Sequence, residues 1–159
     1  MSPLSAMDIA ASGLSVQRTR MSLVASNLAN MHSTRDPEIE GPYRRREVVV
    51  EALPIAEFQE IMGGALGADS DAMWADPELQ EALRMVSVSE VRIDDAPPLR
   101  VHDPGHPDAD ADGYVLMPNI VPMREMTDMM DAARAYEANL AILRTLRDMS
   151  QSALDIGAL

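Results

Sequence analysis

The 159-residue chain predicts an α+β protein in which a long helix at each end flanks a small strand-rich middle. Near both termini, apolar residues recur at spacings of three and four, which is the pattern of long helices that pair as a coiled coil. In the central part, short valine-rich runs lie between prolines and glycines, which is typical of short strands. We therefore expect three regions: a helix in 1–36, a β-rich domain in 37–118 and a second helix in 119–159.

The first helix is expected over residues 2–31, with Ser2 as its cap and Pro3 at the first helical position. Its regular heptad positions predict a seam. One position holds Met7, Leu14, Met21 and Leu28, and the other holds Ala10, Gln17, Val24 and Met31. Gly13 disfavours a helix by about 1 kcal/mol relative to alanine, so it marks a close helix crossing or a kink.

The middle region predicts short strands over residues 43–52, 84–93, 99–102 and 113–117. The first of these contains Arg44, Arg45 and Arg46, which look like a basic patch. The acids Glu47 and Glu51 beside them favour a solvated strand instead. Residues 54–83 are acidic and rich in glycine, which predicts a flexible surface insertion between the first two strands.

The second helix is expected over residues 119–157. Its seam is expected at Met126, Met129, Ala133, Tyr136, Leu140 and Leu143, and it continues through Leu146 only after a one-residue shift. The apolar surface of this helix is wider than one stripe, which is usual for a helix buried on several sides. We therefore expect neighbouring copies or homologous subunits to cover it. The expected assembly interface comprises Met7, Leu14, Met21, Val24, Leu28, Met126, Met129, Ala133, Tyr136, Leu140, Leu143 and Leu146.

Charge and hydropathy exclude two classes of partner. The net charge is −13, and residues 61–113 hold twelve acids against three arginines. An acidic surface argues against nucleic-acid binding, which needs clustered basic residues. No apolar run is long enough to span a membrane. Without a recognisable cleavable signal peptide the chain is expected to be cytoplasmic, unless another export route serves it.

The sequence provides no support for catalysis, for a cofactor or for a metal site. Asp108–Gly113 matches the first half of an EF-hand calcium loop, but the twelfth position is Asn119 rather than a bidentate carboxylate, and a strand-like run follows. His32, His102 and His106 lack zinc-ligand spacing, and the chain has no cysteine. An acidic turn is the better interpretation of Asp108–Gly113. A calcium-responsive acidic binding module and a coiled-coil adaptor remain as alternatives.

Three blocks of sequence carry a family resemblance. Residues 11–14, 17–18, 27–30 and Thr34 resemble the N-terminal signature of bacterial flagellar rod and hook proteins. Residues 41–45 and 103–119 resemble the proximal-rod branch of that family, and Glu125–Asn139 with residues 153–157 forms the third block. The departures are Ala133, where the family more often has serine, and the long 54–83 segment. The motif residues are Ser12, Gly13, Leu14, Asn27, Asn30, Arg134, Tyr136 and Asn139.

The resemblance implies a structural subunit of the flagellar rod, or another axial rod or hook subunit, and no enzyme. It implies helical assembly with copies of itself and with other rod proteins of the proximal and distal rod. It further implies export through the flagellar type III apparatus without cleavage, and a place in the periplasmic part of the basal body. That route would account for an exported chain without a signal peptide.

Overall fold

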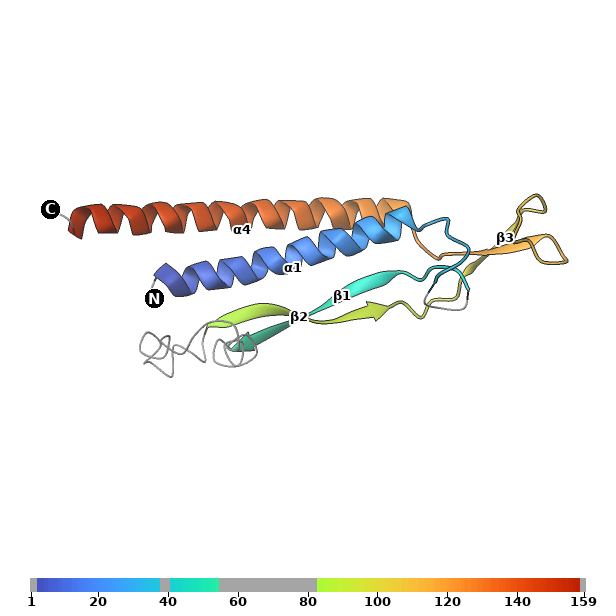
Figure 1. Ribbon diagram of the computed structural model, residues 1–159, viewed down its shortest axis with the longest axis horizontal. Helices are drawn as coiled ribbons and strands as arrows, with labels where there is room; N and C mark the ends of the chain where they lie inside the picture. Colours follow the sequence, from blue (N-terminus) through green and yellow to red (C-terminus); the bar gives the residue numbers. More distant parts are fainter. Residues whose placement is uncertain (1–2, 38–40, 55–82, 158–159) are drawn as a thin grey trace. The chain divides into compact units, whose positions relative to one another are not determined.

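A computed structural model describes residues 3–37, 41–54 and 83–157 and confirms the α+β class (Figure 1). The elements, in chain order, are α1 (Pro3–Ala29), β1 (Arg46–Pro54), β2 (Arg84–Ile93), β3 (Leu99–His102), β4 (Tyr114–Met117) and α4 (Pro122–Gly157). The expected Ser2 cap and nearly all of the 54–83 insertion lie outside the described residues. Among the residues described, neither helix combines the length and apolarity that a membrane span requires.

The described residues form two compact units. Unit 1 contains residues 3–18, 50–54, 83–89 and 134–157, and unit 2 contains residues 19–37, 41–49 and 90–133. The helices α1 and α4 and the strands β1 and β2 each contribute residues to both units. Because each unit is compact by itself, the packing below is described unit by unit.

In unit 1, α1 packs on β2 as well as on α4. Ile9 contacts the buried Met85, and the Val86 N–H donates to the Ser12 hydroxyl at 3.3 Å. That hydroxyl donates to the Ile9 carbonyl at 2.8 Å. Val16 is also buried, although the expected seam omits it. The expected seam is too narrow because it considers only one packing partner for a helix that contacts two.

The buried line of α4 differs from the expected seam. Its most buried members are Glu125 and Ala132, and partly buried residues continue the heptad pattern. The line consists of Glu125, Met129, Ala132, Tyr136, Asn139, Leu143, Leu146 and Ser150. Met126 is 51% exposed, so its expected place in this line is wrong, and Ala133 and Leu140 flank the line. The expected one-residue shift near Leu146 is also wrong. Because the line includes the polar residues Glu125 and Asn139, it runs from Glu125 to Ser150 in alternating steps of four and three residues without a shift.

α4 begins at Pro122 rather than at Asn119. Proline is favoured at the first helical position, where its missing N–H leaves no hydrogen bond unmade. The Asn119 side chain instead donates to the Pro97 carbonyl at 3.3 Å. Asn119 therefore anchors the segment before β3 and does not start the helix.

The strands form two small sheets, one of β1 with β2 and one of β3 with β4. The arrows of β1 and β2 point in opposite directions in Figure 1. β3 and β4 are antiparallel, with Leu99 opposite Met117 and His102 opposite Tyr114. The bounds of β2 and β3 match the predictions, whereas β1 starts at Arg46 instead of Tyr43. The Tyr43 N–H donates to the Ser33 carbonyl at 3.2 Å, so this backbone closes a loop and does not join the sheet ladder.

Candidate functional site

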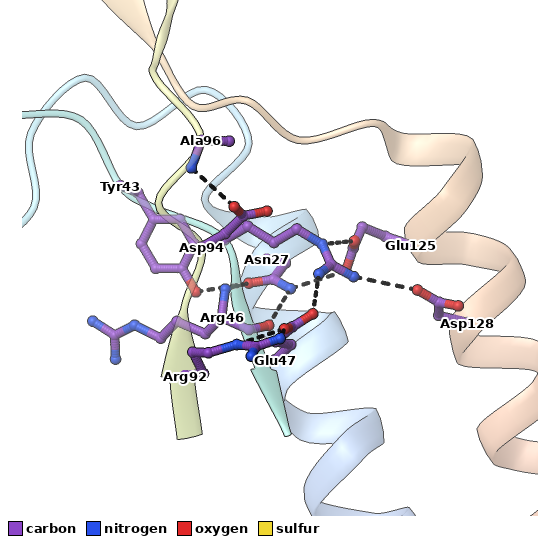
Figure 2. A network of polar contacts seen from close by, with 10 residues as sticks. Asn27, Tyr43, Arg46, Glu47, Arg92, Asp94, Ala96, Glu125 and Asp128 are labelled. Atoms are coloured by element: carbon purple, nitrogen blue, oxygen red, sulfur yellow. Dashed lines mark hydrogen bonds and ion pairs between the residues drawn. The ribbon is translucent and has the colours of Figure 1, made fainter. Parts of the chain in front are cut away.

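A network of polar side chains, buried at its centre, joins three distant segments of unit 2 (Figure 2). We call it the polar junction and define it as Asn27, Tyr43, Arg45, Glu47, Glu125 and Asp128. Asn27 comes from α1, Glu125 and Asp128 come from the start of α4, and the other three lie in and before β1. The side chains of Asn27, Tyr43 and Glu125 point toward one another in Figure 2.

Asn27 uses the full hydrogen-bonding capacity of its amide. Its nitrogen donates to the Arg46 carbonyl and to Glu125 Oε2, both at 2.9 Å. Its oxygen accepts the Tyr43 hydroxyl and the Arg46 N–H, both at 3.0 Å. The residue is 1% exposed. Two donors and two acceptors are all that an asparagine side chain offers, so no other polar group fits this position equally well.

Glu125 is fully buried, and Arg45 balances its charge. Arg45 Nε donates to Glu125 Oε1 at 2.7 Å, while its terminal nitrogens reach Glu47 at 3.0 Å and Asp128 at 3.4 Å. Burial by itself would lower the pKa of Arg45, but the bonds and charges of Glu125 and Glu47 outweigh burial and raise this pKa. The side chain of Arg45 is only 12% exposed. The expectation that Arg45 belongs to a solvated strand is therefore wrong.

Glu47 links the junction to β2. Arg92 Nε donates to Glu47 Oε1 at 2.9 Å, and a second nitrogen of Arg92 bonds the same oxygen. The Arg92 hydrogen bond, despite the opposing effect of burial, lowers the pKa of Glu47, with a further contribution from Arg45. The carboxylate is thus held ionised on the side of the junction that solvent reaches.

The lowered pKa of Glu47 predicts an acid-sensitive contribution to stability. Its ordinary pKa is 4.5, so the unfolded chain takes up this proton at a higher pH than the folded chain does. The contribution is complete above about pH 5 and is lost as the pH falls below the ordinary value toward the lowered one. We expect Glu47→Gln to reduce the dependence of unfolding free energy on pH in this window, measured by urea denaturation. In an Arg92→Met background the same substitution is expected to have a smaller effect, and an equal effect would contradict the assignment.

In unit 1, α1 and α4 approach closely at Gly13. A Cβ added to Gly13 would lie 2.8 Å from Asn139 Nδ2. Of the two expectations for Gly13, the close helix crossing is therefore confirmed. The crossing brings together two residues of the family motif that are far apart in the sequence.

The crossing predicts a coupling between these two positions. In an Asn139→Ala background, Gly13→Ala is expected to raise the free energy of unfolding by up to about 1 kcal/mol, the helix propensity difference. In the wild-type background the new methyl group meets Asn139, so the gain is expected to be smaller or reversed. Urea denaturation of the four proteins measures this double-mutant cycle. Equal gains in both backgrounds would show that the helices do not meet here.

The aspartates of the EF-hand-like segment are engaged within the protein. Asp108 accepts the Thr34 hydroxyl at 2.7 Å and pairs with Arg35. The Thr34 hydrogen bond lowers the pKa of Asp108. Asp110 accepts the Tyr114 N–H at 2.8 Å, the largest cause of its lowered pKa, and Arg100 at 2.9 Å. In the described ranges, no three histidine, cysteine, aspartate or glutamate residues are grouped to hold a metal.

The turn in this segment requires glycine. Gly113 has φ of +78°, a conformation that residues with a Cβ rarely adopt. Its N–H donates to the Asp110 carbonyl at 3.0 Å, which closes the turn that leads into β4. The segment is therefore built as a tight acidic turn, and the calcium alternative is not favoured.

Comparison with known proteins identifies the family. Residues 7–35 match the family model described as flagella basal body rod protein, and residues 111–156 match the one described as flagellar basal body rod FlgEFG protein C-terminal. The flagellar basal-body rod protein FlgC of Bacillus subtilis is 36% identical, with 99% of each chain covered. FlgC of Salmonella typhimurium is 37% identical over 99% of each chain. The chain belongs to the FlgC family.

The two matched regions of this FlgC-family chain meet at both helix contacts. Gly13 and Asn27 lie in the first region, and their partners Asn139 and Glu125 lie in the second. The resemblance inferred from the motifs is confirmed by these matches. The remaining motif residues differ from one another in how deeply they are buried. Ser12 is buried against β2, Leu14 and Tyr136 are partly buried, and Arg134 is exposed.

Asn30 terminates α1 in the FlgC-family chain. Its side-chain nitrogen donates to the Ser26 carbonyl at 2.9 Å, and its oxygen accepts the Ser33 hydroxyl at 3.1 Å. Ser26 also lies within hydrogen-bonding distance of the Tyr43 hydroxyl, at 3.3 Å. The Asn27–Asn30 motif thus has two roles, because Asn27 enters the polar junction and Asn30 closes the helix end beside it.

Of the expected interface residues, Val24 is buried in unit 2 and Met126 is exposed, and all the others are partly buried. Their role in assembly stays a prediction. Four junction residues, Tyr43, Arg45, Glu125 and Asp128, belong to the resemblance blocks but are not among the predicted site residues. A charged residue at a heptad position of α4 is the signal that would have identified Glu125. Because Asn27 uses its full hydrogen-bonding capacity and Glu125 is fully buried, the junction suits a structural role.

Proposed function

We propose that this chain is a structural subunit of the bacterial flagellar proximal rod, which polymerises through its terminal helices into a helical tube that transmits torque. One observation carries the proposal: α4 has a large exposed apolar surface besides its buried line. The large apolar side chains of α4 that are at least half exposed are Met123, Met126, Met130, Ile142, Met149, Leu154 and Ile156. The names of the FlgC relatives, basal-body rod proteins, support the same function.

Assembly would bury this surface. Each large apolar side chain removed from water contributes roughly 1.5–3 kcal/mol as an upper estimate. Contacts between different surfaces of neighbouring copies do not close a ring unless the rotation returns to its start, and so they generate a helical filament. The exposed surface of α4 is therefore suited to contacts between rod subunits, either copies of this chain or other proximal and distal rod proteins.

A coiled-coil pairing of α1 with α4 would provide the stiffness that torque transmission needs. Two observations support this pairing: the heptad spacing of the buried line of α4, and the sequence positions of the contacts that α1 makes with α4 in each unit. Asn27 follows Gly13 by 14 residues, and its partner Glu125 precedes Asn139, the partner of Gly13, by 14 residues. Both intervals equal two heptads of sequence and run in opposite chain directions.

The proposed location is the periplasmic rod of the basal body, reached through the flagellar type III export apparatus. An epitope-tagged chain tests this in a flagellated host. We expect the tagged chain in purified basal bodies when the export gate is functional, and only in the cytoplasm when the gate is inactivated. A coiled-coil adaptor would instead stay in the cytoplasm with or without the gate, and that result would contradict the proposal.

A further inference from the structure

A groove of about 160 Å³ in unit 2 adjoins the polar junction. It is lined by residues of α1, of the segment that leads into and begins β1, and of the first turns of α4. We call it the arginine groove, because its charged lining residues are Arg20, Arg45, Arg46, Arg124, Glu47 and Asp128. Positive charge is therefore in excess at this groove, although the net charge of the chain is −13.

Acids of the chain itself engage two of the four arginines. Arg45 pairs with all three carboxylates of the polar junction (Figure 2). A terminal nitrogen of Arg46 lies 3.6 Å from Asp36 Oδ2. The charges of Arg45 and Arg46 are thus balanced from within the protein.

The guanidinium groups of Arg20 and Arg124 are not balanced in this way. Both residues are exposed, and within residues 3–37, 41–54 and 83–157 neither side chain forms an ion pair, a hydrogen bond or a contact with an aromatic ring. Arg20 lies on α1 and Arg124 on α4. Two cations without a partner therefore line one groove from two different helices.

The position of Arg124 is unfavourable for the helix that carries it. Arg124 is the third residue of α4, and the positive end of the helix dipole disfavours a cation in the first turn. Asp128, one turn further along, pairs with Arg45 and not with Arg124. Because neither the helix nor a neighbouring acid stabilises Arg124 here, its position favours a role in binding.

Size and charge indicate which anion the arginine groove accepts. Guanidinium groups bind carboxylates and phosphates through paired, charge-assisted hydrogen bonds. The groove is smaller than the roughly 300–1,000 Å³ of typical cofactor and small-molecule sites, which excludes a nucleotide. Glu47 and Asp128 in its lining oppose the double charge of a phosphate, and the acidic chain as a whole repels nucleic acids and anionic membranes. A single carboxylate side chain satisfies both limits.

We propose that the arginine groove is a docking site for an acidic segment of a partner protein. One aspartate or glutamate side chain of that segment enters the groove and accepts hydrogen bonds from Arg20 and Arg124. The carboxylate thus bridges α1 and α4 beside the polar junction. This inference goes beyond the proposed rod function and does not depend on it, since it concerns a binding property of the isolated chain.

A blocked Gly-Glu-Gly tripeptide, which carries one carboxylate, tests the site on the full-length chain. NMR follows the Nε–H signals of the arginines during titration, because this method detects weak binding. We expect the signals of Arg20 and Arg124 to shift together with one dissociation constant. Arg20→Gln and Arg124→Gln are each expected to weaken binding several-fold. Since both arginines bind the same carboxylate, the double variant is expected to weaken it by less than the product of the two single effects.

Matched controls separate the arginine groove from general attraction to exposed cations. Arg18→Gln changes an exposed arginine of α1 that does not line the groove, and it is expected to leave the dissociation constant unchanged. The neutral Gly-Gln-Gly tripeptide is expected to cause no shift. Urea denaturation is expected to show equal stability for wild type and Arg20→Gln, because this arginine has no partner among the described residues.

Four outcomes would overturn the inference. Absence of shifts with Gly-Glu-Gly, or equal weakening by Arg18→Gln and Arg20→Gln, would show that the groove is no specific site. Tighter binding of inorganic phosphate than of the tripeptide would assign the groove to a free anion. A less stable Arg20→Gln chain would show that the protein itself engages this arginine. Because every measurement uses the isolated chain, these failures are distinguishable from failure of the rod function.

Discussion

Glu125→Ala is expected to lower the free energy of unfolding by about 3–5 kcal/mol, the loss typical of breaking a buried ion pair by removing one partner. The substitution leaves Arg45 largely buried without its closest carboxylate, and it leaves one N–H of Asn27 unpaired. Urea denaturation measures the loss. Because the junction joins α1, β1 and α4, we also expect loss of motility when the variant replaces the wild-type chain.

Two controls separate charge pairing from general damage to α4. Asp128→Ala removes a neighbouring carboxylate that is 36% exposed and 3.4 Å from Arg45, and it is expected to cost less than about 1 kcal/mol. The double variant Arg45→Met with Glu125→Leu removes both charges, and it is expected to recover much of the loss. A loss for Glu125→Ala no greater than that for Asp128→Ala would contradict the account of the junction.

Ala132→Asp is expected to lower the free energy of unfolding by at least about 3 kcal/mol, because it buries a carboxylate without a partner. Ala132 is 1% exposed and lies on the buried line of α4. Ala141→Asp places the same charge on the exposed part of the same helix, and it is expected to change stability by less than about 0.5 kcal/mol. Both values are measured by urea denaturation. Similar losses for the two variants would show that the buried line is wrongly placed.

The sequence was most informative where local rules decide the structure. Alternating valines predict β2, and the prolines on either side of residues 99–102 delimit β3, and both strands have the predicted bounds. Pro3 and Pro122 lie in the first positions of the two helices. The family motifs supplied the connection between distant segments that periodicity alone does not provide. The low helix propensity of glycine predicts either a close crossing or a kink at Gly13, and the structure shows the crossing.

The sequence was least informative where polar residues are buried. A seam selected for apolar side chains includes Met126 and passes over Glu125, although the structure buries the glutamate and exposes the methionine. Arg45 has no local signal that separates it from the exposed Arg44 beside it. Burial of such residues depends on partners more than 70 positions away, here Glu125, so no short-range pattern predicts it.

The rod function is tested most directly by deleting the gene for this chain and imaging basal bodies by electron cryotomography. The proposed function predicts inner rings without a completed rod in the deletion strain, and complete rods when the wild-type chain is restored. Intact rods, hooks and filaments in the deletion strain would contradict it.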